Sequence, residues 1–330
     1  MPRAPVLKRV LSTLFGLLTL ALLLAAWILV PAHLQIRRER PALPTLQDVR
    51  QAIAVEGDLP IRLSWIDTSS QATPRSNVLG SGDPHPERPY RLCHSSFVLE
   101  WSDGRILLVD TGMTRSQAED FGALGEWAGA APIEVRTTVG EALGERAGAV
   151  AAVVFTHLHV DHVDGVRELC AAPRRAEISV FMTHAQAGPP NYTTRAALDT
   201  VRQLDCLRPV EIDAGIAPLP GFPGVFVFDA GGHTPGSQVV MASVRTPEGP
   251  KPVVFSGDIV NNIDGINYDV GKPLAYRLFV VPESETRLGE LRRFLRAMRD
   301  EAGFEILVSH DEGALQASSV APYAGAVAGR

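Results

Sequence analysis

Cysteine is scarce in this sequence. The 330 residues include three cysteines, Cys93, Cys170 and Cys206, which lie far apart and form no Cys-x-x-Cys pair. A small, odd and scattered set of this kind implies no disulfide framework and leaves at least one thiol unpaired. A basic excess is absent as well, because 31 lysines and arginines face 37 aspartates and glutamates, and the formal net charge is −6. Bulk charge therefore gives no reason to expect a nucleic-acid partner.

Internal repeats of a fixed period are also absent, but one long hydrophobic run is present. Val10–Val30 holds no charged residue in 21 positions and is rich in leucine. As a helix rising about 1.5 Å per residue it would span about 30 Å, the thickness of a bilayer's hydrocarbon core. A signal peptide is the rival interpretation, since Lys8 and Arg9 precede the run. The run exceeds the usual signal length of about 7–15 residues, and Pro31 disfavours a cleavage site, so the sequence favours an uncleaved transmembrane anchor.

The rest of the chain reads as one folded domain behind this anchor. We expect a short basic tail at residues 1–9, the anchor at 10–31, a linker at 32–55 and one large α/β domain at 56–330. Arg37, Arg38 and Arg40 nearly balance the basic residues before the run. The positive-inside rule then favours an amino terminus in the cytoplasm. That orientation would place the large domain on the extracytoplasmic side of the membrane.

Three histidines and an aspartate stand within six consecutive positions. They are His157, His159, Asp161 and His162. Imidazole and carboxylate are the nitrogen and oxygen ligands that zinc and related metals prefer, and neither apolar packing nor surface solubility explains such a cluster. The apolar residues 151–155 before it predict a buried strand that delivers the cluster to its carboxyl end. The sequence therefore predicts a metal site after this strand.

Three further segments repeat the arrangement of an apolar strand followed by a candidate ligand. Residues 225–228 lead to His233, residues 253–255 lead to Asp258, and residues 306–308 lead to His310. A lone histidine is more often structural than a metal ligand, but the repeated position after a strand favours ligation here. Together with the first run, these segments supply five histidines and two aspartates, which is enough for two metal ions.

This ordered set resembles the metallo-β-lactamase-fold hydrolases, whose signature is a His-x-His-x-Asp-His run followed by a distant histidine, a bridging aspartate and a last histidine. The resemblance implies an α/β fold, a four-layer αβ/βα sandwich, here preceded by a single transmembrane helix. It also implies two divalent metal ions, with zinc as the expected metal. One ion would take His157, His159 and His233, the other Asp161, His162 and His310, and Asp258 would bridge them.

An earlier aspartate matches the same pattern. Asp110 follows the apolar residues 106–109. By resemblance it would accept a hydrogen bond from a ligand imidazole and so orient that ligand. The alternative is that Asp110 caps a turn through its own side chain. The other histidines are read as structural or solvent-exposed: His33, His85, His94 and His184.

A pair of ions of this kind supports hydrolysis without a serine or cysteine nucleophile. Two metals about 3.5–4 Å apart can share one water, lower its pKa from about 15.7 towards about 7, and present a bridging hydroxide at neutral pH. The same ions polarise a substrate carbonyl or phosphoryl oxygen. We expect Asp161 and Asp258 to be the catalytic carboxylates, with Asp161 carrying a proton to the leaving group. The oxygen-reducing diiron members of the superfamily have glutamate where this chain has His159, which favours hydrolysis over redox chemistry.

The carboxyl-terminal part resembles the N-acyl-homoserine lactone lactonases, notably in residues 232–236 and 309–311. It departs from them at Ser237, where a histidine is common, and at Asn261, where a substrate-binding tyrosine is expected. Asn261 and Tyr268 are therefore the candidates for substrate binding. The expected reaction is cleavage of an ester or lactone, with acyl-homoserine lactones as the implied substrates.

A tethered domain favours small-molecule or lipid-like substrates, because an acyl tail partitions to the bilayer and raises its own concentration near the site. Phosphodiester, phospholipid, thioester and β-lactam hydrolysis are the alternatives within the same fold. A membrane-tethered metal-binding protein without catalysis is the alternative from another class. The intact set of ligands argues against it, since a degenerate copy would be expected to have lost at least one.

Overall fold

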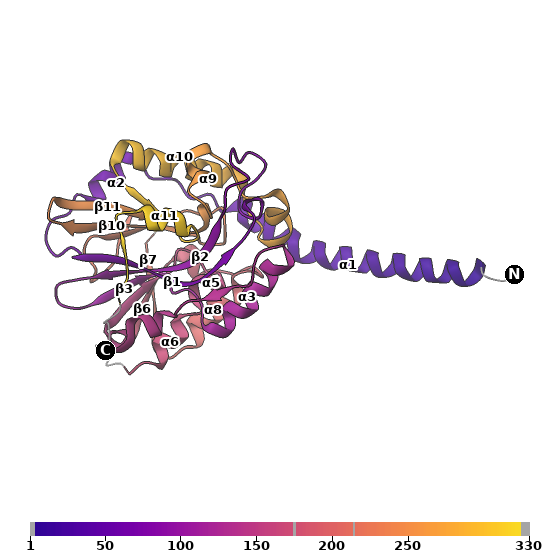
Figure 1. Ribbon diagram of the computed structural model, residues 1–330, viewed down its shortest axis with the longest axis horizontal. Coiled ribbons are helices and arrows are strands. Elements are labelled where there is room, and N and C mark those ends of the chain that lie inside the picture. Colours follow the sequence, from indigo (N-terminus) through magenta and orange to yellow (C-terminus); the bar gives the residue numbers. More distant parts are fainter. Residues whose placement is uncertain (1–3, 174–175, 214, 325–330) are drawn as a thin grey trace.

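Two β-sheets face each other at the centre of the molecule, and one long helix projects from it (Figure 1). The computed structural model describes residues 4–173, 176–213 and 215–324, so residues 1–3 of the expected basic tail lie outside the described residues. The larger sheet has 8 strands, in the spatial order β13 (Ala321–Pro322), β1 (Arg62–Ala72), β2 (Arg91–Glu100), β3 (Ile106–Val109), β5 (Val150–Val154), β6 (Ile178–Thr183) and β7 (Leu207–Ile212), with β4 (Glu134–Val135) beside β1. The smaller sheet has 5, in the order β12 (Glu305–Leu307), β11 (Gly249–Phe255), β10 (Gln238–Thr246), β9 (Val225–Asp229) and β8 (Ala217–Pro218).

Helices cover the outer faces of both sheets (Figure 1). The helices on the smaller sheet are α2 (Leu46–Ile53), α9 (Asp264–Tyr268) and α10 (Glu285–Ala302). Those on the side of the larger sheet are α3 (Arg115–Trp127), α4 (Val139–Leu143), α5 (Val160–Val163), α6 (Val166–Ala171) and α8 (Arg195–Gln203). The short helices α7 (His184–Ala187) and α11 (Glu312–Ala317) follow β6 and β12. The result is an α/β sandwich with helices outside and sheets inside, as the resemblance implies.

The faces of the two sheets that meet form the central core. Phe97 and Leu99 of β2, Val240 of β10 and Phe255 of β11 all have 0% exposure, and the Phe97 and Phe255 rings lie 4.9 Å apart. Side chains alternate across a strand, so each inward residue is followed by one that faces a helix. Val98, next to Phe97, belongs instead to the cluster beneath α4, α6 and α8. Both faces of the larger sheet are therefore buried at its centre, which explains why its central strands β3 and β5 are continuous apolar runs.

The helix α1 (Ala4–Arg38) contains the apolar run and continues past it into the domain. It is a helix long and apolar enough to cross a membrane, and its apolar window is wholly exposed. Its last turns behave differently, because Ala32 and Ile36 are buried against the domain. Further along, α2 contributes Val49 to the core between α10 and the smaller sheet. Residues 32–55, expected as a linker, thus contain the end of one helix, the whole of another, and buried side chains.

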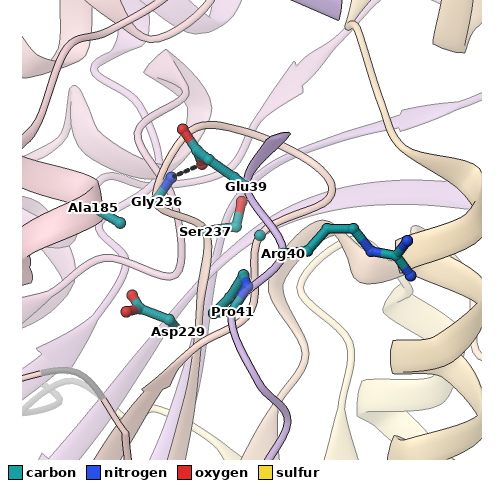
Figure 2. Close-up of a pocket in the computed structure, with 8 residues that line it drawn as sticks. Glu39, Arg40, Pro41, Ala185, Asp229, Gly236 and Ser237 are labelled. Carbon is teal, nitrogen blue, oxygen red and sulfur yellow. Dashed lines mark hydrogen bonds between the residues drawn. The ribbon is translucent and has the colours of Figure 1, made fainter. Parts of the chain in front are cut away.

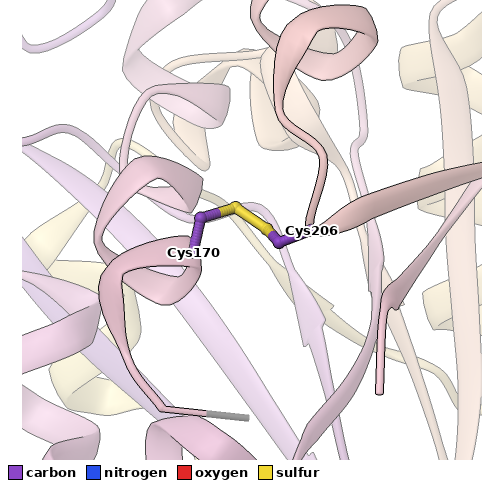
Figure 3. The surroundings of a disulfide bond; sticks show 2 residues. All are labelled: Cys170 and Cys206. Carbon is purple, nitrogen blue, oxygen red and sulfur yellow. A yellow bond between two sulfur atoms is a disulfide. The ribbon is translucent and has the colours of Figure 1, made fainter. Parts of the chain in front are cut away.

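One disulfide corrects the expectation drawn from the cysteine count. Cys170 in α6 and Cys206 just before β7 are bonded to each other (Figure 3). The parallel order of β5, β6 and β7 brings these two segments together although 36 positions separate them. The third cysteine, Cys93 on β2, is free and buried, in agreement with the expected unpaired thiol.

Candidate metal centre

The histidine-rich run occupies the turn between β5 and α5. His157 lies just beyond the strand, His159 immediately precedes the helix, and Asp161 and His162 are in its single turn. All four side chains are buried. The other candidate ligands follow strands of the smaller sheet: His233 comes after β9, Asp258 after β11 and His310 after β12. The structure thus gathers all seven predicted ligands at one edge of the sandwich.

One group of nitrogens surrounds a single point. His157 Nε2 lies 3.1 Å from His159 Nδ1, and His233 Nε2 lies 3.3 Å from the same Nδ1 atom. Ligands about 2.0–2.1 Å from a tetrahedral zinc stand about 3.3 Å apart, so these separations fit one ion held by three imidazoles. Asp258 completes the group, with its Oδ2 atom 3.5 Å from His233 Nε2.

A second group lies on the other side of Asp258. His162 Nε2 and His310 Nε2 are 3.1 Å apart, and Asp258 Oδ1 lies 2.9 Å from the latter and 3.3 Å from the former. Asp161 Oδ2 approaches His310 Nε2 to 3.5 Å. The two oxygens of Asp258 therefore face different groups of imidazoles. Its Oδ1 atom has no hydrogen-bond partner among the described residues, although it is buried.

The outward-facing nitrogen of each imidazole in the first group has its own acceptor. His157 Nδ1 lies 3.2 Å from Thr156 Oγ1, and His159 Nε2 lies 3.1 Å from Thr193 Oγ1. His233 Nδ1 lies 2.6 Å from the carboxylate of Glu283. A neutral imidazole carries one proton, so a proton donated outward leaves a lone pair on the inward nitrogen. Three inward lone pairs at one point repel each other unless a cation lies between them.

The second group has the same arrangement. His162 Nδ1 donates to Asp110 Oδ2 at 2.8 Å, and His310 Nδ1 donates to the backbone carbonyl of Cys93 at 2.7 Å. Asp110 also accepts hydrogen bonds from the backbone N–H and hydroxyl of Thr156, each at 2.8 Å. Its φ angle of 59° is unusual for a residue other than glycine, which holds the carboxylate under the histidine-rich turn. The geometry of Asp110 is that of a carboxylate that orients a ligand imidazole.

The electrostatics of the site match a cation centre. Burial lowers the pKa of His157 well below its ordinary value and that of His159 to about 3, so both imidazoles are neutral donors of lone pairs. Burial also lowers the pKa of His162, but the carboxylates of Asp110 and Asp161 outweigh it and raise that pKa well above its ordinary value. Burial raises the pKa of Asp258, yet the neighbouring positive groups hold it well below its ordinary range. The carboxylates thus attract positive charge to the position where the lone pairs converge, and a divalent metal supplies it.

Two residues of this network have no signal in the sequence. Glu283 is buried and accepts from His233 Nδ1, while Lys272 Nζ donates to Glu283 Oε1 at 2.8 Å. Lys272 is buried as well, and its Nζ atom lies 3.7 Å from Asp258 Oδ2. Both residues lie in segments without a ligand motif, so only the tertiary structure shows that they support the centre.

A third residue beside the centre is His94, for which burial excludes the solvent-exposed alternative and leaves the structural one. His94, expected to be structural or exposed, is a fully buried residue of β2 whose Nε2 atom lies 3.9 Å from Asp161 Oδ2. Its Nδ1 atom faces Ser69, while its Nε2 atom has no hydrogen-bond partner among the described residues. Burial lowers the pKa of His94 to about 3, so this imidazole is neutral beside the second ligand group.

The two candidates for substrate binding lie in different surroundings. Asn261 is buried, and its side-chain oxygen has no partner among the described residues. Tyr268 is 48% exposed, and its hydroxyl lies 3.4 Å from His85 Nε2, so its contact is with the loop after β1 and none with a metal ligand is found. Tyr276 is nearer to the centre, because Lys272 Nζ lies 5.4 Å from the centroid of its ring. Burial raises the pKa of its hydroxyl well above the ordinary value, and the charges of Glu283 and Asp258 raise it further.

A pocket of 270 Å³ adjoins the loop that carries His233, and it is lined by Glu39, Arg40, Pro41, Ala185, Asp229, Gly231, Gly236 and Ser237 (Figure 2). The Glu39 carboxylate accepts a hydrogen bond from the Gly236 backbone at 3.0 Å. Gly236 has φ 69°, and a Cβ atom there would lie 2.1 Å from the Gln186 Cα, so only glycine fits. None of the described residues that line this pocket is a histidine. Residues 39–41, which follow α1, therefore contact the loop that carries His233. The candidate metal ligands themselves lie outside this pocket.

Residues 90–310 match the family described as the metallo-beta-lactamase superfamily. The chain belongs to this superfamily. Its matched region begins before β2 and ends at His310, and so contains all seven predicted ligands. The superfamily relation, the ligand cluster and the sandwich together identify a metallo-hydrolase. No curated protein matches the chain.

Several solved structures share the metallo-β-lactamase sandwich. An N-acyl homoserine lactone hydrolase with N-hexanoyl-L-homoserine bound at its catalytic metal center is similar at a TM-score of 0.57 and 18% identity, over 79% of this chain and 98% of that one. A variant of the B. thuringiensis enzyme AiiA with N-decanoyl-L-homoserine at its active site gives 0.55 and 19%, over 79% and 98%. A probable metal-dependent hydrolase from Staphylococcus aureus gives 0.53 and 16%, over 78% and 91%. At these identities the likeness shows the fold.

Proposed function

We propose that this chain is a membrane-anchored, dinuclear metal-dependent hydrolase that cleaves a carboxylic ester or lactone. The observation that carries the proposal is the position of buried Asp258, whose Oδ2 atom faces His233 in one ligand group and whose Oδ1 atom faces His162 and His310 in the other. Each group offers four donor residues, which suits zinc bound by nitrogen and oxygen. By this proposal His157, His159 and His233 hold one ion, Asp161, His162 and His310 hold the other, and Asp258 joins them.

The protein's own residues would position and protect this chemistry. When bound, divalent metal ions lower the pKa of water and polarise a carbonyl oxygen, which removes the need for a side-chain nucleophile. Asp110 and Glu283 fix the ring orientation of His162 and His233. Lys272 holds Glu283 in place and adds a positive charge beside Asp258. Asp161 would carry a proton to the leaving group.

The substrate class rests on likeness and on chemistry. Structures of homoserine lactone hydrolases share the fold, and the centre offers the charge stabilisation that attack on a carbonyl carbon requires. Tyr276, rather than the exposed Tyr268, is the tyrosine that we propose as a hydroxyl near the substrate. Zinc is the metal that we propose, and small acyl lactones or lipid-like esters are the substrates.

The disulfide supports the proposed location. Disulfides persist in oxidising compartments and are rare in the cytosol of most organisms. The Cys170–Cys206 bond therefore agrees with a domain on the extracytoplasmic side of a membrane that α1 crosses with its amino terminus inside. The charge balance around the apolar run favours the same orientation.

A substrate panel tests the proposed reaction. We expect the full chain in mild detergent to hydrolyse acyl-homoserine lactones or aryl esters, to lose this activity when a chelator removes the metal, and to regain it when Zn²⁺ is restored. Phosphodiester, thioester and β-lactam substrates complete the panel. A preference for one of these would replace the ester proposal. The absence of turnover by fully metal-loaded protein on all of them would favour a metal-binding protein without catalysis.

A further inference from the structure

An exposed apolar turn stands next to the metal centre. We call residues 274–280 the apolar turn; its last five residues form a π-helical turn, η4 (Tyr276–Val280). Leu274, Phe279 and Val280 have exposed fractions of 62%, 68% and 55%. Solvent-exposed apolar side chains in such a short segment form a patch that soluble surfaces rarely present, and patches of this kind mark interaction sites.

The apolar turn lies at the base of α1. His33 Nε2 in that helix lies 3.1 Å from the Leu278 carbonyl, and Figure 1 shows α1 leaving the domain beside the orange coil of this segment. His33 stands three residues after the end of the uncharged run, about 5 Å along the helix axis. Interfacial apolar side chains reach about 5–10 Å into the boundary between headgroups and acyl chains. If α1 crosses a bilayer, the apolar turn therefore meets the surface of that same bilayer.

Neighbouring residues have the chemistry of a membrane interface. The Tyr192 ring is 41% exposed, and its hydroxyl donates to the Val280 carbonyl at 3.0 Å. Tyrosine is enriched where headgroups meet acyl chains. Arg37 and Arg38, in the last turn of α1, are exposed and lie within reach of lipid phosphates. Apolar, aromatic and basic side chains thus lie together near the end of α1 that enters the domain.

The same turn borders the metal centre. Tyr276 is part of it, and Lys272, which pairs with Glu283 behind His233, lies two positions before its first residue. From the other side, Thr193 contacts the ligand His159 while the adjacent Tyr192 contacts the turn. The side of the site formed by the turn and by residues 192–193 is thus the side that would face a membrane crossed by α1.

We propose that the apolar turn inserts into the acyl region of the leaflet where α1 leaves the membrane, and that a substrate with a long acyl chain passes over it from the bilayer to the metal centre. This inference rests on the proposed ester or lactone hydrolysis and narrows its substrate to a lipid-borne acyl compound. The occupant of the turn is the bilayer, because α1 fixes its distance from the membrane. A second copy of the chain or a soluble protein is the competing outcome of the test.

The insertion is tested by lipid quenching. We would place the full chain in phosphatidylcholine nanodiscs with the single substitution Phe279→Cys, and attach an environment-sensitive fluorophore. Cys93 is buried, and the other two cysteines are bonded to each other, so the label is directed to the new thiol. Phospholipids with a spin label on the acyl chain should quench this probe. The matched control is Glu248→Cys, because Glu248 lies in the hairpin between β10 and β11, at the ends of these strands away from His233 and Asp258.

Quenching at position 279 with none at position 248 is the expected result. Equal and low quenching at both positions would overturn the proposal. A probe at 279 that is shielded from water but not quenched by labelled lipid would point to a second copy or another protein, and would equally overturn it. None of these readouts depends on hydrolysis, so they report on membrane insertion even if the proposed function fails.

The route of the substrate is tested with two compounds that share the scissile bond. One has a short acyl chain and dissolves in water, and the other has a long chain and resides in the bilayer. The double variant Leu274→Ser, Phe279→Ser should raise KM for the bilayer-borne compound by about tenfold or more, because two apolar side chains would no longer insert into the bilayer. Turnover of the soluble compound should stay unchanged. Ile61→Ser is the control, because Ile61 is 48% exposed and pairs with the end of β2 farthest from the centre.

Equal losses on both compounds would show that the turn only maintains the fold of the site, and would overturn the proposed route. Equal effects of the Ile61→Ser control would do the same. If the unmodified chain cleaves neither compound, the proposed hydrolysis fails instead, and the quenching result stands alone. The two failures are therefore distinguishable.

Discussion

Replacing Asp258 with alanine is expected to abolish hydrolysis and to remove at least one metal ion per chain. The Oδ1 atom of Asp258 faces His162 and His310, and its Oδ2 atom faces His233, so no other predicted ligand serves both groups. Loss of a charged group that stabilises the reaction at a centre of this kind lowers kcat by about 10²–10³-fold, and loss of an ion lowers it further. Steady-state kinetics with elemental analysis on the same preparation measures both effects.

Two further variants separate metal loss from misfolding. Asp258→Asn keeps the size of the side chain but removes its charge, and should lose the same ion with an unchanged circular dichroism spectrum. Asp229→Ala is the control, since Asp229 lies at the end of β9 and lines the neighbouring pocket rather than either ligand group. Full activity and full metal content in Asp258→Ala would refute the assignment of this residue. Equal losses in Asp229→Ala would show that the effect is not specific to the ligand.

The second large effect is expected from two carboxylates that contact ligands rather than metal. Asp110→Asn and Glu283→Gln should each weaken metal retention by about 10- to 100-fold, the range for groups that orient metal-bound histidines. Asp110 accepts hydrogen bonds from His162 and Thr156, and an amide nitrogen cannot accept in its place. Asparagine tolerates the positive φ at this position, so the backbone should be preserved. Glu283 supports His233 in the same way.

Because the two carboxylates contact different ligand groups, each variant should weaken a different ion. Competition with a chromophoric chelator measures the affinity of each, and the double variant should lose both. Glu285→Gln is a matched control for Glu283, since Glu285 pairs with Arg292 on α10. Metal affinity unchanged in Asp110→Asn would leave that residue as a turn-capping side chain. An identical loss from the same ion in both variants would contradict the division into two groups.

The parts of the site that the sequence predicts share one physical feature. His157, His233, Asp258 and His310 each come soon after an apolar strand, and in a layered sheet such strand ends meet at one edge. Local patterns therefore place the ligands without knowledge of the fold. The buried strands and the apolar amino-terminal helix are predictable for the same reason, because hydrophobic periodicity and run length are local properties.

The parts that the sequence does not predict depend on tertiary contacts. Lys272 and Glu283 contact the His233 side chain from segments without a motif. His94 approaches Asp161 from strand β2 of the larger sheet, whereas Asp161 follows strand β5. The disulfide is missed because the pairing of Cys170 with Cys206 follows from the order of three parallel strands. The Lys272–Glu283 ion pair and the Cys170–Cys206 disulfide can be recognised only when the structure shows which segments lie next to each other.

The metal content of the full chain tests the central claim most directly. The purified protein would be dialysed at neutral pH against metal-free buffer, and its bound metals counted by elemental analysis against protein concentration. Two ligand groups that share one aspartate predict two equivalents of a divalent metal per chain, with zinc the expected element. One equivalent or fewer would contradict the paired centre.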